Sequence, residues 1–115
     1  MTTGSKGALS HLRVLDLTSA SAAYCGKLLA DLGAKVVKIE PVAGDPARWE
    51  APLAGEGTSI PFVYENANKR SAVIDLESTD GRDRFMALAD RSDLILESMP
   101  VGRLAELGLS FEALA

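Results

Sequence analysis

The sequence predicts an α/β fold, a Rossmann-like parallel sheet with helices on both faces, of which this chain holds an incomplete part. Short aliphatic stretches alternate with helix-like stretches in the order β-α-β-loop-β-α-β-α. The aliphatic stretches are mostly apolar along their length, which is typical of parallel strands that are covered on both faces. Four strands are few for such a sheet, and residues 109–115 look like the beginning of a helix, with Ser110 as its N-cap. We therefore expect the chain to be a piece of a larger protein.

The first part of the chain should form two strands with a helix between them. Residues 12–17 (LRVLDL) and 35–40 (KVVKIE) have the composition of short strands. Residues 19–24 are small and are expected to form a loop. Residues 25–32 then place three leucines on one helical face, and Gly33 is suited to end that helix.

The second part begins with a long loop over residues 41–59, which holds three of the five prolines and three glycines. Loops of this length in compact domains are usually functional or disordered. The following elements have clear start or stop signals, namely Pro61 in a first turn, Ser78 as an N-cap and Gly108 as a terminator. They are expected at 60–66 (helix), 71–76 (strand), 78–89 (helix), 93–97 (strand) and 101–107 (helix).

Composition limits the function classes. The chain has 115 residues, is 47% hydrophobic and carries a net charge of −4, so neither nucleic acid nor an anionic membrane is an expected partner. No apolar stretch approaches the roughly 20 residues of a membrane span, and we expect a cytoplasmic location. Residues 1–8 are expected to be a disordered polar tail, and residues 9–115 the N-terminal part of a larger domain. Cys25 is expected to be a small buried residue within a helix.

A ligand should bind beyond the carboxyl ends of the strands, because open α/β sheets place their sites there. Four segments should meet at that edge: residues 18–23, 40–49, 76–78 and 97–103. The first lacks the G-x-G-x-x-G pattern, so NAD is not expected, even though Glu40 stands where a ribose-binding acid would be. In the alternative interpretation, Glu40 simply ends a strand in solvent. Metal-ligand spacings such as C-x-x-C are missing from the sequence, and no metal cofactor is expected.

Two pairs of residues could contact an anionic or aromatic ligand. Arg48 and Trp49 could offer a cation to a phosphate and a flat face to a purine, unless Trp49 merely anchors the loop to the core. Lys69 and Arg70 directly precede a strand and should point to opposite sides of it. One of them could reach a ligand or a carboxylate across a subunit interface; the alternative is a solvated turn.

The order of several strings resembles a known family. LRVLDLT, LLADLGAKVVKIEP, GDPAR, NANKRSAVIDLES, GRDRFMALADRSDLILES and LAELGLSFEAL occur in this order over residues 9–115. Together they resemble the N-terminal portion of the family III CoA-transferases (CaiB/BaiF type), which include formyl-CoA transferase and α-methylacyl-CoA racemase.

The resemblance implies a transferase that moves CoA from an acyl-CoA to a carboxylic acid. In the family an aspartate nucleophile forms an acyl anhydride and then a CoA thioester. That aspartate lies beyond Ala115, so the resemblance implies no catalytic residue in this chain and no activity of the chain alone. It also implies coenzyme A as carrier, and an interlocked homodimer or a tandem or complementary subunit as partner. Two alternatives stay open, a non-catalytic scaffold or interaction lobe and the racemase branch.

The resemblance, combined with the placement at the carboxyl ends, implies a set of CoA-contacting positions that come from the loops after the strands and from the segment before the third strand. The expected CoA-binding residues are Ser19, Ala20, Ser21, Ala22, Arg48, Lys69, Arg70, Ile74, Ser98 and Met99.

The chain also departs from the family pattern. A Gly-Pro usual after the first strand is missing, and the usual Glu-Asn-Phe after the fourth strand is Glu97-Ser98-Met99. Glu77 and Glu106 stand where the family often has a lysine and an arginine. CoA carries several phosphate charges, and each reversal should weaken its binding by about 1 kcal/mol or more.

Overall fold

A parallel four-stranded sheet forms the centre of the chain. The computed structural model describes residues 7–115, so the tail expected over residues 1–8 lies largely outside the described residues. The strands are β1 (Arg13–Leu17), β2 (Lys35–Glu40), β3 (Arg70–Val73) and β4 (Leu94–Glu97). They stand in the order β3-β2-β1-β4, and all three pairings are parallel. The order reverses between β1 and β4, which is where ligands bind in doubly wound sheets.

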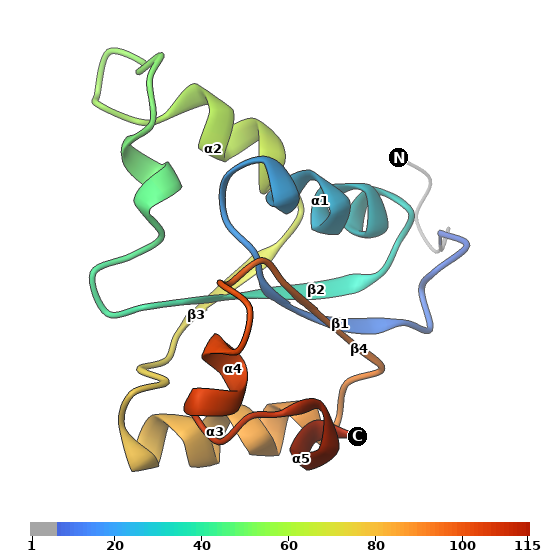
Figure 1. The fold of residues 1–115 in the computed structure, drawn as a ribbon. Helices are drawn as coiled ribbons and strands as arrows, with labels where there is room; N and C mark the ends of the chain where they lie inside the picture. The colour runs from blue at the N-terminus through green and yellow to red at the C-terminus, as the bar shows by residue number, and fades with distance from the viewer. Residues whose placement is uncertain (1–6) are drawn as a thin grey trace.

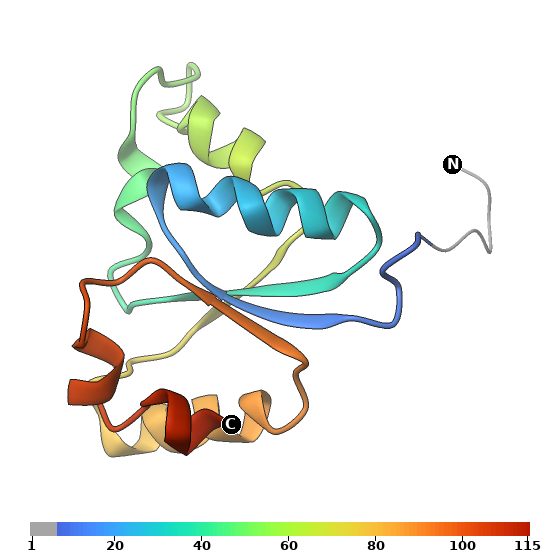
Figure 2. The same cartoon turned by 45° about the vertical axis from the view of Figure 1, so that its right-hand side comes forward.

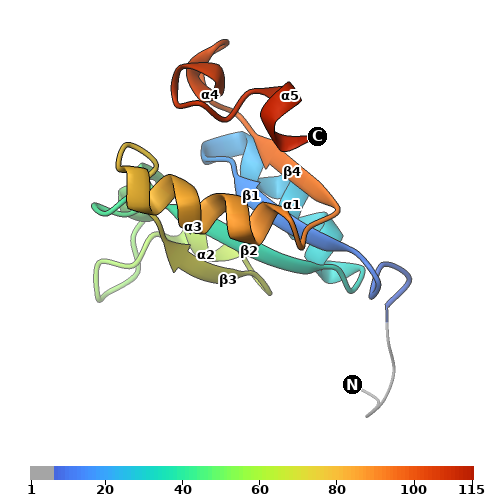
Figure 3. The same ribbon diagram turned by 90° about the horizontal axis from the view of Figure 1, so that it is seen from below.

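Helices cover both faces of this sheet, as the sequence predicted. Helices α1 (Ala23–Asp31) and α2 (Ile60–Glu65) lie on one face, and α3 (Thr79–Ala89) lies on the other (Figures 1 and 2). The short helices α4 (Arg103–Glu106) and α5 (Phe111–Leu114) share the side of α3 and gather next to β4 (Figure 3). No helix within residues 7–115 combines the length and the apolar composition needed to cross a membrane.

Several predicted boundaries need correction. The loop expected over residues 19–24 holds a 3-10 turn, η1 (Ala20–Ala22), and α1 already begins at Ala23. Ala22 has helical backbone angles and forms no side-chain cap, so no capping residue marked this start. The long loop over residues 41–59 contains a second 3-10 turn, η2 (Pro46–Trp49). Strand β3 begins one residue earlier than expected and is shorter, and Cys25 is exposed rather than buried.

The termini of the helices follow from specific residues. The hydroxyl groups of Ser59, Ser78 and Ser110 accept hydrogen bonds from the backbone N–H three residues on, and so cap α2, α3 and α5. Pro61 lies in the first turn of α2, where its missing N–H costs nothing. After α1, Gly33 adopts a φ of 103°, which a residue with a side chain reaches only at a cost.

The sheet face toward α3 is packed with apolar side chains. Phe85 of α3 is fully buried there, against residues of all four strands or of the turns that follow them. The buried members of this cluster are Leu15, Leu17, Ile39, Ile74, Phe85, Leu107 and Leu109. Burial of large side chains of this kind stabilises a fold by about 2 kcal/mol each.

The face toward α1 is apolar at one end and charged at the other. Val14 and Val36 pack with Ala30 of α1 near the amino ends of the strands. Further along, Asp16 lies in register with Lys38, and Lys38 in turn with Ser71. Because alternate residues of a strand share a face, Glu40 also points to this side. The strands therefore direct a row of charged side chains into the space under α1 and α2.

Gly26 of α1 makes room for this charged row. A Cβ atom at position 26 would lie 2.6 Å from Oδ2 of Asp16 and about as close to Lys69, at 3.0 Å from its Cε. These two side chains are themselves buried, so neither can swing away without losing its partner. The close approach of α1 to the sheet depends on glycine here.

We predict that Gly26→Ala destabilises the fold by about 2 kcal/mol, because overpacking and a displaced buried charge outweigh the ~1 kcal/mol gain in helix propensity. Urea unfolding followed by circular dichroism measures the change. The matched control is Gly55→Ala, since position 55 lies in an exposed turn with open space around it. That control should stay within about 0.5 kcal/mol of the unmodified chain. Equal stabilities for the two variants would contradict the close packing described above.

Candidate functional site

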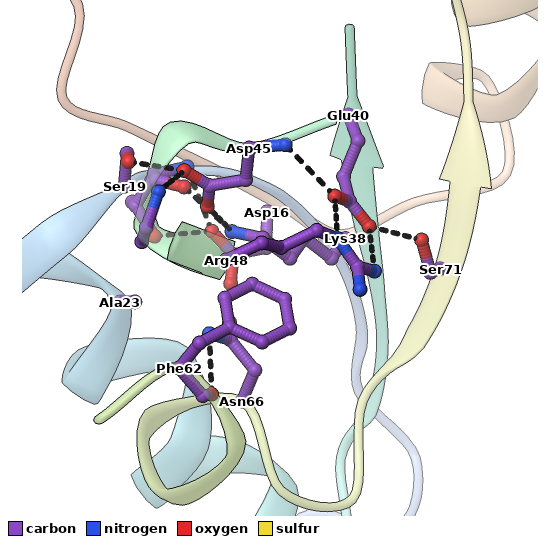
Figure 4. Close-up of polar contacts among 12 residues, drawn as sticks. Asp16, Ser19, Ala23, Lys38, Glu40, Asp45, Arg48, Phe62, Asn66 and Ser71 are labelled. Atoms are coloured by element: carbon purple, nitrogen blue, oxygen red, sulfur yellow. Dashed lines mark hydrogen bonds and ion pairs between the residues drawn. The ribbon is translucent and has the colours of Figure 1, made fainter. Parts of the chain in front are cut away.

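Three ion pairs lie side by side under α1 and α2, at the carboxyl-terminal half of the sheet. One pair joins β1 to the segment before β3, and two pairs join β2 to the loop that follows it (Figure 4). Each pair contains a carboxylate that is almost completely buried. Since burying an unpaired charge is very costly, each of these side chains constrains the position of its partner.

The deepest pair joins Asp16 of β1 to Lys69, the residue before β3. Nζ of Lys69 lies 2.6 Å from Oδ2 of Asp16, and the two side chains are 1% and 0% exposed. The same ammonium group donates to the carbonyl oxygen of Ala23 at 2.9 Å and to Oδ1 of Asn66 at 2.8 Å. Asp16 also accepts from the backbone N–H of Thr18. This pair thereby holds the start of α1 and the end of α2 against the sheet.

The second pair joins Lys38 of β2 to Asp45 at 2.7 Å. The Lys38 ammonium also donates to the carbonyl oxygen of Thr18 at 2.8 Å, and the Asp45 carboxylate accepts from the Ser19 hydroxyl. Asp45 is the N-cap of η2 and accepts from the backbone N–H of Ala47. The loop after β1 and the loop after β2 are thus fastened to one another through a single carboxylate.

The third pair joins Glu40, at the end of β2, to Arg48 of η2. The guanidinium approaches the carboxylate with two nitrogens, Nε at 2.6 Å and Nη2 at 2.7 Å, the two-pronged geometry that makes such pairs strong. Glu40 also accepts from the hydroxyl of Ser71 and from the backbone N–H of Asp45. The Arg48 guanidinium lies 4.4 Å from the ring centre of Phe62, a cation–π contact that reaches α2.

The protonation behaviour of these groups follows from their partners. The hydrogen bonds from Arg48 lower the pKa of Glu40 to about 2, against the opposing effect of burial. Burial alone would raise the pKa of Asp45, but the Lys38 ammonium and the Ser19 hydroxyl lower it overall. For Lys69, burial lowers the pKa even though Asp16 acts in the opposite direction. Glu40 and Asp45 are therefore held ionised at neutral pH.

A pocket of about 330 Å³ lies at the carboxyl ends of the strands, on the sheet face that packs against α3. All four segments expected at the carboxyl edge contribute to it, so that prediction is confirmed. Its apolar floor comes from the cluster beneath the sheet, while its rim is polar. The lining residues are Leu17, Thr18, Ser19, Ile39, Glu40, Pro41, Asp45, Pro46, Ile74, Asp75, Leu76, Glu77, Met99, Arg103 and Leu107. A larger hollow of about 590 Å³ lies along β4, between α3, α4 and α5. Of the four segments at the carboxyl edge, only the one after β4 contributes to it.

The structure separates the predicted site residues into two groups. Ser19, Ile74 and Met99 line the pocket, and Ser98 accepts a hydrogen bond from the backbone N–H of Ser19 at 3.1 Å. Ala20 and Ala22 belong to η1 beside it, and the side chain of Ser21 lies outside the described residues. Arg48, Lys69 and Arg70 do not line the pocket: Arg48 faces Glu40, Lys69 faces Asp16, and Arg70 is exposed at the start of β3.

Three alternative interpretations from the sequence are wrong. Glu40 does not end its strand in solvent, because it is 2% exposed and bound by Arg48. Lys69 is not part of a solvated turn, because its ammonium is buried on Asp16 of the same chain. Trp49 does not anchor the loop to the core, since it is 63% exposed and its ring packs beside Gly44 at the surface.

Sequence reasoning missed Asp16, Lys38 and Arg103. For the first two a signal existed: a charged residue inside an otherwise aliphatic parallel strand points into a covered face, where it needs a partner. For Arg103 the sequence placed only its segment, residues 97–103, at the carboxyl edge, and the position of α4 then brings its side chain to the pocket.

The comparisons with known proteins agree with this geometry. Residues 9–115 match the sequence profile described as CoA-transferase family III. The chain is 42% identical over 110 residues to succinyl-CoA:(R)-benzylsuccinate CoA-transferase subunit BbsE of Thauera aromatica, covering 92% of this chain and 27% of that protein. It is 39% identical over 113 residues to succinyl-CoA:mesaconate CoA-transferase of Haloarcula hispanica, covering 94% of this chain and 28% of that protein.

Solved structures show the same similarity. A CaiB/BaiF family protein from Brucella suis superimposes with a TM-score of 0.88 at 32% identity, over 96% of this chain and 30% of that one. A protein of Mycobacterium tuberculosis superimposes with a TM-score of 0.86 at 34% identity, over 94% of this chain and 30% of that one. The chain therefore spans between a quarter and a third of the length of these relatives.

The pKa of Glu40 generates a prediction for acid stability. Its folded-state pKa of about 2 lies below its ordinary value of 4.5, so the unfolded chain takes up this proton first as the pH falls. The stabilisation from the pair should be fully present above about pH 4.5 and lost progressively as the pH approaches 2. Urea unfolding at a series of pH values measures this loss.

Glu40→Gln should flatten the pH dependence between pH 4.5 and 2, because the variant has no proton to bind at this site. Glu56→Gln removes an exposed carboxylate from the long loop and keeps the Glu40–Arg48 pair, so it should retain the decline. An unchanged slope in Glu40→Gln would mean that Arg48 does not hold this carboxylate in solution.

The backbone of Ala20 generates a second prediction. Ala20 has a φ of 53°, a left-handed conformation that costs a residue with a Cβ atom about 1 kcal/mol. Ala20→Gly should therefore raise the free energy of unfolding by up to about 1 kcal/mol. As a contrast, Ala22→Gly alters a residue with ordinary helical angles and should be neutral or destabilising. A loss of stability in Ala20→Gly would contradict the left-handed conformation.

Proposed function

This chain belongs to CoA-transferase family III, and we propose that it is the N-terminal, CoA-binding portion of a protein that moves CoA between an acyl-CoA and a carboxylic acid. The observation that carries the proposal is the pocket at the carboxyl ends of β1, β2 and β3, bordered by the loop after β4. A crevice at the carboxyl edge of a doubly wound sheet is where this architecture binds nucleotide-like ligands. Membership of the family indicates that the ligand is CoA, and the pocket is where we expect CoA to bind.

The chemistry of the pocket suits one part of such a carrier. Leu17, Ile39, Ile74, Met99 and Leu107 form an apolar floor, which favours the flat or methylene-rich portions of a CoA molecule. Thr18 and Ser19 also line the pocket, and their hydroxyl groups donate to the carboxylates of Asp16 and Asp45. The three ion pairs on the opposite face keep the loops after β1 and β2 in place, so this half of the pocket is formed in the free chain.

The acyl donor and the acceptor belong to the larger protein. Two relatives are named as transferases that use succinyl-CoA, with (R)-benzylsuccinate and mesaconate as the other compounds. We infer that the protein to which this chain corresponds takes a succinyl-CoA-like donor and a carboxylic acid acceptor. We also infer that this chain is inactive alone, because the family resemblance implies that none of its aspartates is the nucleophile.

The partner in the whole protein is proposed to be a second copy or a complementary subunit. Relatives named as a subunit BbsE and as alpha and beta subunits show that chains of this family occur in assemblies. A non-catalytic scaffold is the second candidate function. The carboxylates of Asp75 and Glu77 at the pocket rim favour it, since they oppose the phosphates of CoA.

We predict that CoA binds to this chain and that Met99→Ala weakens its binding about fivefold or more, because the variant removes apolar surface from the pocket floor. Isothermal titration calorimetry with CoA measures the affinity. The matched control is Met86→Ala, since Met86 is half-buried on the same apolar cluster but does not line the pocket. A chain that gives no heat with CoA would favour the scaffold, and an equal loss in both variants would place the ligand elsewhere.

A further inference from the structure

The charges at the pocket are unevenly neutralised. Five charged side chains line it, Glu40, Asp45, Asp75, Glu77 and Arg103. Arg48 neutralises Glu40, and Lys38 neutralises Asp45, from the opposite face of the sheet. This leaves Asp75 and Glu77 against Arg103, which is the single cation among the described residues that line the pocket.

Two carboxylates contact the guanidinium group of Arg103. Its Nη2 lies 2.8 Å from Oε1 of Glu77, and its Nη1 lies 3.6 Å from Oε2 of Glu106. Glu77 follows β3, whereas Arg103 opens α4, so the pair crosses the mouth of the pocket. Glu106 belongs to α4 itself and does not line the pocket.

The ion pair between Arg103 and Glu77 is easily broken. The side chain of Glu77 is 75% exposed and that of Arg103 is 36% exposed, in contrast to the buried pairs of the site. Exposed ion pairs contribute little to stability, whereas an arginine binds a phosphate through two parallel hydrogen bonds. A phosphorylated ligand that enters the pocket therefore meets a cation whose present partner can be displaced.

We propose that Arg103 is the phosphate-contacting residue of this pocket and that Glu77 competes with the ligand for it, so the pair sets the affinity for phosphorylated carriers. This inference rests on the proposed function for the identity of the ligand. It assigns the contact to a residue that the sequence did not single out. It also makes Glu77 an internal competitor, and it explains how a chain with an acidic rim can still accept an anion.

Four forms of the 115-residue chain test the proposal: unmodified, Glu77→Gln, Arg103→Gln and the double variant, each titrated with CoA by calorimetry. Glu77→Gln should tighten binding about fivefold, because the guanidinium is released and one repulsive charge is removed. Arg103→Gln should weaken it by at least as much. In the double variant the gain from Glu77→Gln should largely vanish, because the residue that it releases is no longer there.

Two controls distinguish a direct contact between Arg103 and a phosphate from a general effect of net charge. Glu112→Gln makes the same change of charge on exposed α5, away from this pocket, and should leave the affinity unchanged. Pantetheine, which carries no phosphate, should bind equally to the unmodified chain and to Glu77→Gln. Circular dichroism of each variant verifies that it is folded.

The outcomes distinguish this inference from the proposed function. If CoA binds but Arg103→Gln binds it as well as the unmodified chain, the assignment of Arg103 is overturned while the function stands. If Glu77→Gln tightens binding equally with and without Arg103, Glu77 acts through its charge alone and the competition is overturned. If no form binds CoA, the proposed function fails and this inference fails with it.

Discussion

Burial of charge on one face of the sheet is the constraint on which the rest of this structure depends. Asp16, Lys38 and Glu40 project from β1 and β2 into the space that α1 and α2 cover, and each needs a partner there. Buried pairs add little net stability compared with apolar residues, yet removing one partner is very costly. Their effect is therefore to select an arrangement. The segment before β3 is held where it supplies Lys69, and the loop after β2 is held where it supplies Asp45 and Arg48. Helix α1 is held by the hydrogen bond from Lys69 to the carbonyl oxygen of Ala23.

The two faces of the sheet make different contributions to the pocket. The face toward α3 supplies apolar packing around Phe85 and the floor of the pocket. The opposite face supplies the polar contacts that hold the loops at the pocket rim. Asp45 shows the connection most directly, because it binds Lys38 and Ser19 and also lines the pocket. A pocket built in this way needs little rearrangement when a ligand arrives, which reduces the entropic cost of binding.

Exposed charges set the electrostatic field at the rim of the pocket. The buried carboxylates are neutralised within the fold, so the field at the mouth is set by exposed side chains, Asp75, Glu77 and Arg103. Exposed charges can be exchanged without disturbing the core, because their interactions are weak and screened. Substitutions at these three positions can thus change the field at the pocket mouth while the sheet and its buried pairs stay the same.

The sequence by itself determined the order of strands and helices, the two covered faces and the segments that meet at the carboxyl edge, because hydrophobic period, serine caps and glycine terminators are local signals. The ordered strings also identified the family. What the tertiary structure decided was the pairing of charges. Lys69 pairs with Asp16, and Glu40 pairs with Arg48, because of strand register and helix placement, which no local sequence pattern encodes. For the same reason only the folded chain brings Arg103 to Glu77, since their contact depends on where α4 stands relative to the end of β3.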